Sequence, residues 1–175
     1  MIGMKRNIMR CFAWGLILLC LTCMSCDPDE MKGADLGVGD ALPTFSVKMN
    51  DGTSVATSDL KGRPSIIVFF ATTCPDCQKE LPEVQCLWDS VDRTAIPVLL
   101  IARAQGQAEI ERYWQSKSFS MTYSPQTDRS IYNLFATSLI PRIYICDRNG
   151  IIRYIHTDDV LPTCETLLAE LQTIK

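Results

Sequence analysis

The sequence has a single histidine, His156, among its 175 residues. A four-ligand zinc site needs two pairs of Cys or His, and past Cys26 the chain has one C-x-x-C pair, Cys74 and Cys77. Glycine-rich phosphate loops are absent, and the formal net charge of −3 shows no excess of basic residues. The sequence therefore gives no support to a four-ligand zinc site, a nucleotide-phosphate site or a nucleic acid partner.

The first 25 residues have the pattern of a secretory signal. Three cations, Lys5, Arg6 and Arg10, precede the apolar run "CFAWGLILLCL" and the small-residue segment "TCMSC". The apolar run is shorter than the roughly 20 residues that a transmembrane helix needs. Removal of residues 1–25 would change the net charge from −3 to −6. We therefore expect a signal peptide over residues 1–25 and a domain that works outside the cytoplasm.

The end of this signal resembles that of a bacterial lipoprotein. Ser25 precedes Cys26, and the charged run "DPDE" follows at once. The resemblance implies a lipid on Cys26 that holds the protein on a bacterial membrane, facing the periplasm or the cell surface. Cys23 is a second candidate for the lipid, and secretion without a lipid is a third possibility. Residues 26–39 are rich in glycine and acidic residues, which is typical of a flexible tether, so the folded domain is expected over residues 40–175.

Past the tether, segments with strand and helix patterns alternate. This order predicts an α/β fold, with a central mixed sheet flanked by helices and an N-terminal hairpin extension. The run "IIVFFA" has the pattern of a central strand that is buried on both faces. The expected strands are 45–49, 53–56, 66–70, 95–103, 119–124 and a closing hairpin over 141–156. The expected helices are 74–91, 107–117, 128–136 (Asp128 as N-cap) and 161–174.

The pair Cys74 and Cys77 lies where the buried strand ends and the next helix begins. The first turn of a helix has free N–H groups and partial positive charge, which stabilise a thiolate. Two Cys at this spacing can form a disulfide without backbone movement, with Cys74 as the exposed attacking sulfur and Cys77 as the shielded resolving one. Half of a metal site, or two inert core thiols, are the alternatives.

Two acidic residues lie within or just after the C-x-x-C motif. Asp76 places an anion beside both sulfurs, which favours a reducing couple over an oxidising one. Glu80 follows Cys77 by three residues and so lies on the same helical face, where it could accept a proton from the Cys77 thiol. The alternative for Glu80 is a solvated carboxylate beside Lys79.

The segment from residue 40 to the C-terminus resembles the thioredoxin superfamily, and most closely its extracytoplasmic TlpA/ResA-type thiol–disulfide oxidoreductases. The matching pieces are "GDALPTFSV", "IIVFFA", "CPDCQKELP" and "IPRIYICDRNGII". The resemblance implies a thioredoxin-like fold, a cis peptide at Pro141 that faces the Cys pair, and a functional role for Glu80. The sequence departs from the family at Thr73, where many members have Trp, and at Ile140, where Thr is usual.

The resemblance also implies how such an enzyme works. Cys74 would attack a disulfide of a protein substrate, and Cys77 would release the mixed disulfide. Ile140 and Pro141, together with Pro75 and Asp76, would bind the substrate. No bound cofactor is expected besides the redox-active Cys pair, and the electrons would come from a membrane or periplasmic dithiol donor.

Two other classes share parts of this pattern. A peroxiredoxin needs P-x-x-x-T-x-x-C, but neither Cys74 nor Cys77 has Thr three and Pro seven residues before it. A copper-delivering protein of the Sco type uses C-x-x-x-C and a distant His, whereas the spacing here is one residue shorter and His156 is expected on a surface strand. Copper binding remains the alternative function.

Three further cysteines are interpreted as small core residues: Cys86, Cys146 and Cys164. Cys86 follows Cys77 by nine residues and should lie on another face of the helix. A disulfide between Cys146 and Cys164 is possible in an oxidising compartment, although the sequence cannot show whether their Cα atoms lie within reach.

Overall fold

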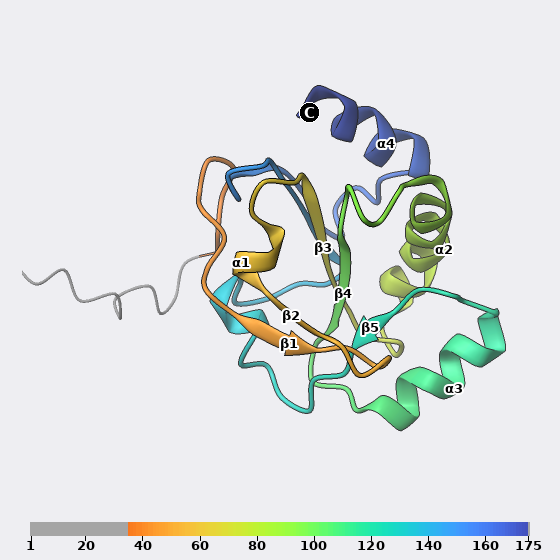
Figure 1. Ribbon diagram of the computed structural model, residues 1–175. Helices are drawn as coiled ribbons and strands as arrows, with labels where there is room; N and C mark the ends of the chain where they lie inside the picture. Colours follow the sequence, from red (N-terminus) through yellow and green to blue (C-terminus); the bar gives the residue numbers. More distant parts are fainter. Residues whose placement is uncertain (1–34, 175) are drawn as a thin grey trace, which may run out of the picture. The chain divides into compact units, whose positions relative to one another are not determined.

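The computed structural model describes residues 35–174, which form two β-sheets and the helices that cover them (Figure 1). One sheet is a hairpin, and the other has five strands in the order β5-β4-β3-β6-β7. The strands are β1 (Ser46–Lys48), β2 (Ser54–Ala56), β3 (Ser65–Phe70), β4 (Val98–Ala102), β5 (Tyr123–Ser124), β6 (Arg142–Cys146) and β7 (Ile152–His156). The helices are α1 (Thr57–Leu60), α2 (Pro75–Ser90), α3 (Gln107–Lys117), the 3₁₀ turn η1 (Tyr132–Leu134) and α4 (Cys164–Thr173).

The five-stranded sheet is mixed, as the sequence predicts. β3 pairs in parallel with β4, and β4 with β5, whereas β6 runs antiparallel to β3 and β7 antiparallel to β6. Every residue of β3 and of β4 is buried, which agrees with the apolar runs 66–70 and 98–102. Parallel neighbours need a crossover, and α2 makes the one between β3 and β4.

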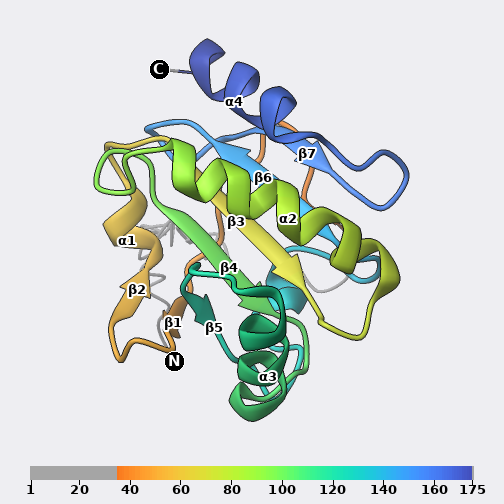
Figure 2. The same cartoon turned by 90° about the vertical axis from the view of Figure 1, so that its right-hand side faces the viewer.

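The two faces of the sheet are covered by different layers. Successive side chains of β3 point to opposite faces, so Phe70 meets Trp114 of α3 while Phe69 meets Tyr132 and Phe135. Figure 2 shows α2, α3 and α4 together on the near side of the sheet. The far side is closed by the segment around η1 and by Phe45, whose ring packs edge-on against Phe135 at 5.4 Å between centroids.

The hairpin of β1 and β2 is the predicted N-terminal extension, and it covers the edge of the sheet at β5. Asn50 donates its backbone N–H to the carbonyl of Tyr123, and its side-chain oxygen accepts the N–H of Tyr123. The hydroxyl of Ser124 donates to the carbonyl of Lys48 at 2.7 Å. The hairpin therefore occupies backbone groups that an open edge strand would leave unpaired.

Residues 35–39 belong to the packed structure and not to the tether in which the sequence analysis placed them. Leu36 is buried and donates its N–H to the carbonyl of Phe135, and Gly39 donates to the carbonyl of Ile152. The folded part therefore starts before residue 40. The predicted signal peptide, Cys26 and the rest of the tether lie outside the described residues. Within residues 35–174, none of the helices has the length and apolar character needed to cross a membrane.

The helix expected over residues 128–136 is wrong, because the chain forms only the short turn η1 there. The carboxylate of Asp128 accepts the N–H of Ser130, two residues on, and starts a turn instead of a long helix. The Tyr132 hydroxyl lies within hydrogen-bond distance of the carbonyls of Ser138 and Leu139, which folds the following loop back over η1. The strand expected over 119–124 is also shorter and is restricted to β5.

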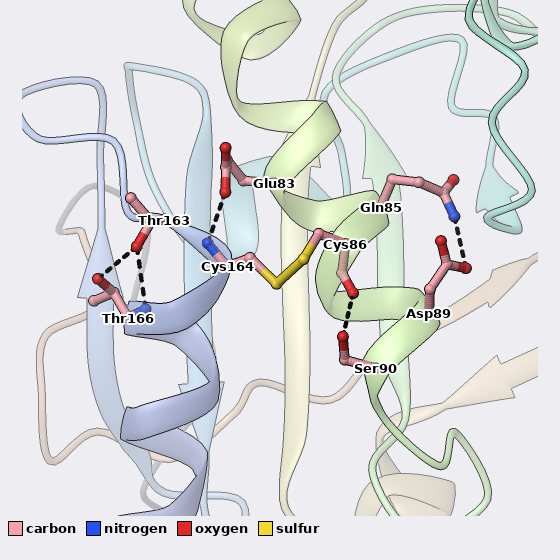
Figure 3. The surroundings of a disulfide bond; sticks show 8 residues. All are labelled: Glu83, Gln85, Cys86, Asp89, Ser90, Thr163, Cys164 and Thr166. Carbon is pink, nitrogen blue, oxygen red and sulfur yellow. Dashed lines mark hydrogen bonds between the residues drawn. A yellow bond between two sulfur atoms is a disulfide. The ribbon is translucent and has the colours of Figure 1, made fainter.

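A disulfide joins Cys86 of α2 to Cys164, the first residue of α4, with 5.9 Å between the Cα atoms (Figure 3). The interpretation of Cys86 and Cys164 as free core residues is therefore wrong, and so is the possible Cys146–Cys164 bridge. Cys146 is free and fully buried in β6, as expected for a core residue. The partner of Cys86 depends on how α4 packs against α2, and sequence spacing carries no information on that packing.

Replacing both Cys86 and Cys164 with Ser should lower the free energy of unfolding. The disulfide closes a loop with a sequence separation of 78, and removal of such a constraint typically costs about 2–4 kcal/mol. Urea unfolding of wild type and variant, each with and without a reductant, measures the effect. The reductant should bring wild type to the level of the variant; equal stability of the two proteins without reductant would contradict the prediction.

Candidate active site

Cys74 caps the N-terminus of α2. Its Sγ accepts the backbone N–H of Cys77 at 3.4 Å, and its thiol donates to the carbonyl of Ile140 at 3.3 Å. Its side chain is half-buried, so the sulfur is open to a partner on one side. The helix begins here because Pro75, which has no N–H to leave unpaired, occupies the first position. The structure thus places Cys74 where the sequence analysis expects the attacking sulfur.

Cys77 lies one turn further along α2 and is fully buried. Burial raises the pKa of its thiol well above the usual range, and the neighbouring Cys74 raises it further. Both cysteines are free thiols here, so this is the reduced form of the pair. A thiol held neutral in this way needs a proton acceptor before it can attack another sulfur.

Glu80 supplies a carboxyl group on the same buried face of α2. It is 1% exposed, and neither carboxylate oxygen has a hydrogen-bond partner among the described residues. Burial raises its pKa from the ordinary 4.5 to about 8, and the nearby Glu83 adds to the rise. The alternative of a solvated carboxylate beside Lys79 is wrong. A carboxyl group with this pKa can exchange a proton near neutral pH.

Asp76 forms an ion pair with Lys79. Its carboxylate accepts from the Lys79 ammonium at 2.7 Å on the exposed side of the helix. The ion pair offsets the negative charge that the sequence analysis placed beside the sulfurs, so Asp76 gives less support to a reducing couple than expected. Pro75 and Thr73 are exposed beside Cys74 and form part of the accessible surface there.

The Ile140–Pro141 peptide is cis, as the family resemblance implies. Both side chains are buried, so this segment presents its backbone to Cys74 and not its side chains. Leu139, the residue before, is 46% exposed and has a φ of +71°. It is an apolar side chain next to the site that the sequence analysis missed, because only the loop conformation exposes it.

Asp35 holds the chain on both sides of the Ile140–Pro141 peptide through hydrogen bonds. Its Oδ1 accepts the backbone N–H of Thr137 at 2.7 Å and the Thr137 hydroxyl at 2.8 Å, and its Oδ2 accepts from Arg142 at 2.8 Å. Thr137 lies before the Ile140–Pro141 peptide and Arg142 directly after it. The bond from the Thr137 N–H, together with Arg142, holds the pKa of Asp35 below its ordinary value. Asp35 was not among the predicted site residues, because it lies within the predicted tether.

Gln105, which follows β4, fixes the loop that leads into Cys74. Its side-chain oxygen accepts the N–H of Thr72 at 2.8 Å, and its amide donates to the Thr72 hydroxyl at 2.6 Å. Gln78 of α2 donates to the carbonyl of Thr72 at 2.7 Å. Gln105 is buried and was also missed, because it lies 33 residues from Thr72 in the sequence and no local pattern relates the two.

His156 lies on β7, where its Nε2 is 2.8 Å from a carboxylate oxygen of Glu170 in α4. Its side chain is 16% exposed, so it is more buried than the expected surface residue. Within residues 35–174, no three side chains of His, Cys, Asp or Glu gather in an arrangement that could hold a metal ion.

Comparison with known families identifies the group to which this fold and site belong. The model of the AhpC/TSA family matches residues 38–155. This chain belongs to the AhpC/TSA family. Its sequence is 22% identical over 142 residues to the thiol–disulfide oxidoreductase ResA of Geobacillus thermodenitrificans, which covers 80% of this chain and 79% of that protein. It is 27% identical over 127 residues to the thioredoxin-like protein YneN of Bacillus subtilis, covering 71% of this chain and 74% of the relative.

Solved structures agree on the fold. The thioredoxin domain of a thiol–disulfide oxidoreductase from Bacteroides vulgatus superimposes with a TM-score of 0.67 at 16% identity, covering 81% of this chain and all of that domain. The thioredoxin-like fold and the resemblance to thiol–disulfide oxidoreductases of the ResA type are therefore confirmed.

Replacing Glu80 with Gln should remove a pH dependence of stability. Because the folded-state pKa of Glu80 is raised, its contribution to folding is fully present below about pH 4.5 and is lost as the pH rises to about 8. The shift corresponds to at most about 5 kcal/mol. Urea unfolding of wild type and Glu80→Gln between pH 5 and 8 tests this. Wild type should lose more stability across that range; parallel pH profiles would show that Glu80 titrates normally.

Replacing Asp35 with Asn should destabilise the fold, because the buried Arg142 then lacks its counter-charge. We expect a loss of roughly 2 kcal/mol at pH 7, in the range for hydrogen bonds to charged groups. The loss should shrink in acid, since a lowered pKa gives stability that is present above about pH 3.8 and is lost below it. The exposed Asp159→Asn is the matched control. An Asp35→Asn protein as stable as this control would contradict the role of the ion pair.

Proposed function

We propose that this chain is an extracytoplasmic thiol–disulfide oxidoreductase that works through the Cys74 and Cys77 dithiol. The observation that carries the proposal is the asymmetry of the pair: Cys74 is half-buried at the N-terminus of α2, while Cys77 is fully buried one turn deeper. One sulfur can meet a large partner, and the other can be reached only from within the site. This is the arrangement that a nucleophile and a resolving thiol require.

In the reducing direction, the Cys74 thiolate attacks one sulfur of a substrate disulfide. A Cys74–substrate bond forms, the substrate disulfide breaks, and the other substrate sulfur leaves as a thiolate that takes up a proton. Cys77 then gives its proton to the Glu80 carboxylate and attacks Cys74 Sγ, which releases the second substrate thiol. The products are a Cys74–Cys77 disulfide and a substrate dithiol, so two electrons have moved to the substrate.

The surroundings suit a protein substrate. The Ile140 carbonyl lies 3.3 Å from Cys74 Sγ, and Leu139, Pro75 and Thr73 expose surface next to it. Pro141 fixes the course of that segment, and Asp76 with Lys79 adds charge at its rim. A membrane-bound or periplasmic dithiol would restore the reduced pair, and the exchange needs no bound cofactor.

The same proposal places the protein at a bacterial membrane, held by a lipid on Cys26 with the folded domain outside the cytoplasm. The order of basic, apolar and small segments before Cys26 supports this placement. The relatives named ResA and YneN cover most of the folded part, which is consistent with one such domain behind the tether.

Single replacements of the two cysteines test the mechanism. Cys74→Ser should abolish the reduction of a disulfide-containing protein such as insulin, whereas Cys77→Ser should accumulate a mixed disulfide between Cys74 and the substrate. Activity is followed by substrate precipitation, and trapped complexes by non-reducing electrophoresis and mass spectrometry. Cys146→Ala, which removes a buried thiol outside the pair, is the control and should retain activity.

Two results would contradict the proposal. Reductase activity retained in Cys74→Ser would exclude Cys74 as the nucleophile. Rapid consumption of hydrogen peroxide that depends on Cys74 but leaves protein disulfides untouched would favour a peroxidase instead.

A further inference from the structure

The Cys86–Cys164 disulfide joins one exposed and one buried cysteine. Cys86 is exposed on the outer side of α2, whereas Cys164 is 6% exposed at the start of α4. Figure 3 shows the bond bridging the two helices, with Glu83 beside it. A thiol from solution can therefore approach the disulfide from the side of Cys86.

This disulfide cannot exchange directly with the Cys74 and Cys77 pair of the same molecule. Cys86 follows Cys77 by nine residues in one continuous helix, which corresponds to about 13 Å along its axis. Direct attack of one sulfur on another needs contact between them. A thiol that opens this disulfide must therefore come from another molecule.

A groove of about 740 Å³ lies alongside the disulfide and gives such a molecule room to approach. Its described lining residues include two carboxylates and neither Lys nor Arg. The lining consists of Glu83, Cys86, Thr163, Cys164, Glu165, Leu168, Ala169 and Gln172. Glu83 accepts the N–H of Cys164 at 2.8 Å, which fixes its carboxylate at the disulfide, and Glu165 is exposed one residue further along α4. The groove therefore favours a cationic thiol and disfavours an anionic one.

We propose that the Cys86–Cys164 disulfide is a second thiol-exchange site, which a small cationic thiol opens by attacking Cys86. The incoming thiolate forms a bond to Cys86 Sγ, the Cys86–Cys164 bond breaks, and Cys164 leaves as a thiolate at the N-terminus of α4. A second small thiol can then release Cys86. The two small thiols end as one disulfide, and the protein gains two electrons as two thiols.

The fold supports this direction of attack. Cys86 is the exposed residue of the pair, and the leaving Cys164 thiolate lies in the first turn of α4, whose partial positive charge opposes the negative charge of Glu83 and Glu165 nearby. After the bond opens, α4 stays in place through the Glu83 contact and the buried Leu167 and Leu171. The site does not rest on the proposed function of Cys74 and Cys77.

The test uses a Cys74→Ser/Cys77→Ser variant, so that small thiols cannot react at the first pair. Cysteamine is the cationic probe and 3-mercaptopropionate the anionic one, and rates are compared per thiolate in native buffer. Acid quenching, alkylation and peptide mass spectrometry locate the adduct. We expect a mixed disulfide on Cys86 with Cys164 alkylated, and faster reaction with cysteamine. Glu165→Gln should reduce this preference by about twofold to fivefold.

Glu109→Gln is the matched control, since Glu109 is also an exposed carboxylate in the first turn of a helix, α3, and does not line the groove. It should leave the preference for cysteamine unchanged. Three results would overturn the proposal: an adduct on Cys164 instead of Cys86, a preference that Glu165→Gln does not alter, or a rate that rises with urea in step with global unfolding. The last result would mean that the disulfide is protected in the folded protein.

Discussion

The junction between β3 and α2 is the constraint on which the site depends. β3 is buried on both faces and pairs in parallel with β4, so the chain must leave the sheet at the end of β3 and return by a crossover helix. The first N–H groups of that helix have no backbone partner within it, and the Cys74 sulfur accepts one of them. The position of the Cys74 sulfur thus follows from the pairing of the strands.

Burial then gives the groups along α2 different surroundings. Cys74 is open to a partner, while Cys77 and Glu80 face the core, where burial raises the pKa of each. The low polarity around α2 therefore shields the Cys77 thiol, and in the proposed mechanism it also lets Glu80 exchange a proton near neutral pH.

The sequence predicted the features that depend on local pattern. Alternating apolar runs gave the order of strands and helices, and the position of C-x-x-C after "IIVFFA" placed Cys74 and Cys77 at the start of a helix. Helical spacing also put Glu80 on the face of Cys77, which the structure confirms as buried. These features need only the periods of 2 and 3.6 residues and the rules for helix ends.

The features that the sequence did not predict depend on contacts between distant segments. Asp35 meets Thr137 across 102 residues, Gln105 meets Thr72 across 33, and Cys86 meets Cys164 across 78. None of these pairs has a periodic signal, because each contact is set by how two elements pack. The helix expected over residues 128–136 failed for the same reason, since the contacts of the Tyr132 hydroxyl with a later loop replace helical propensity there.

The reduction potential of Cys74 and Cys77 tests the central claim most directly. Protein starting at residue 27 would be equilibrated in buffers of defined potential, its thiols trapped with an alkylating reagent, and the peptides identified by mass spectrometry. The account predicts that Cys74 and Cys77 convert together in one two-electron transition, and that a reductase shows a midpoint near the value of thioredoxin, about −270 mV. If the two cysteines stay unpaired at every potential, they are not a redox couple and the proposed mechanism fails.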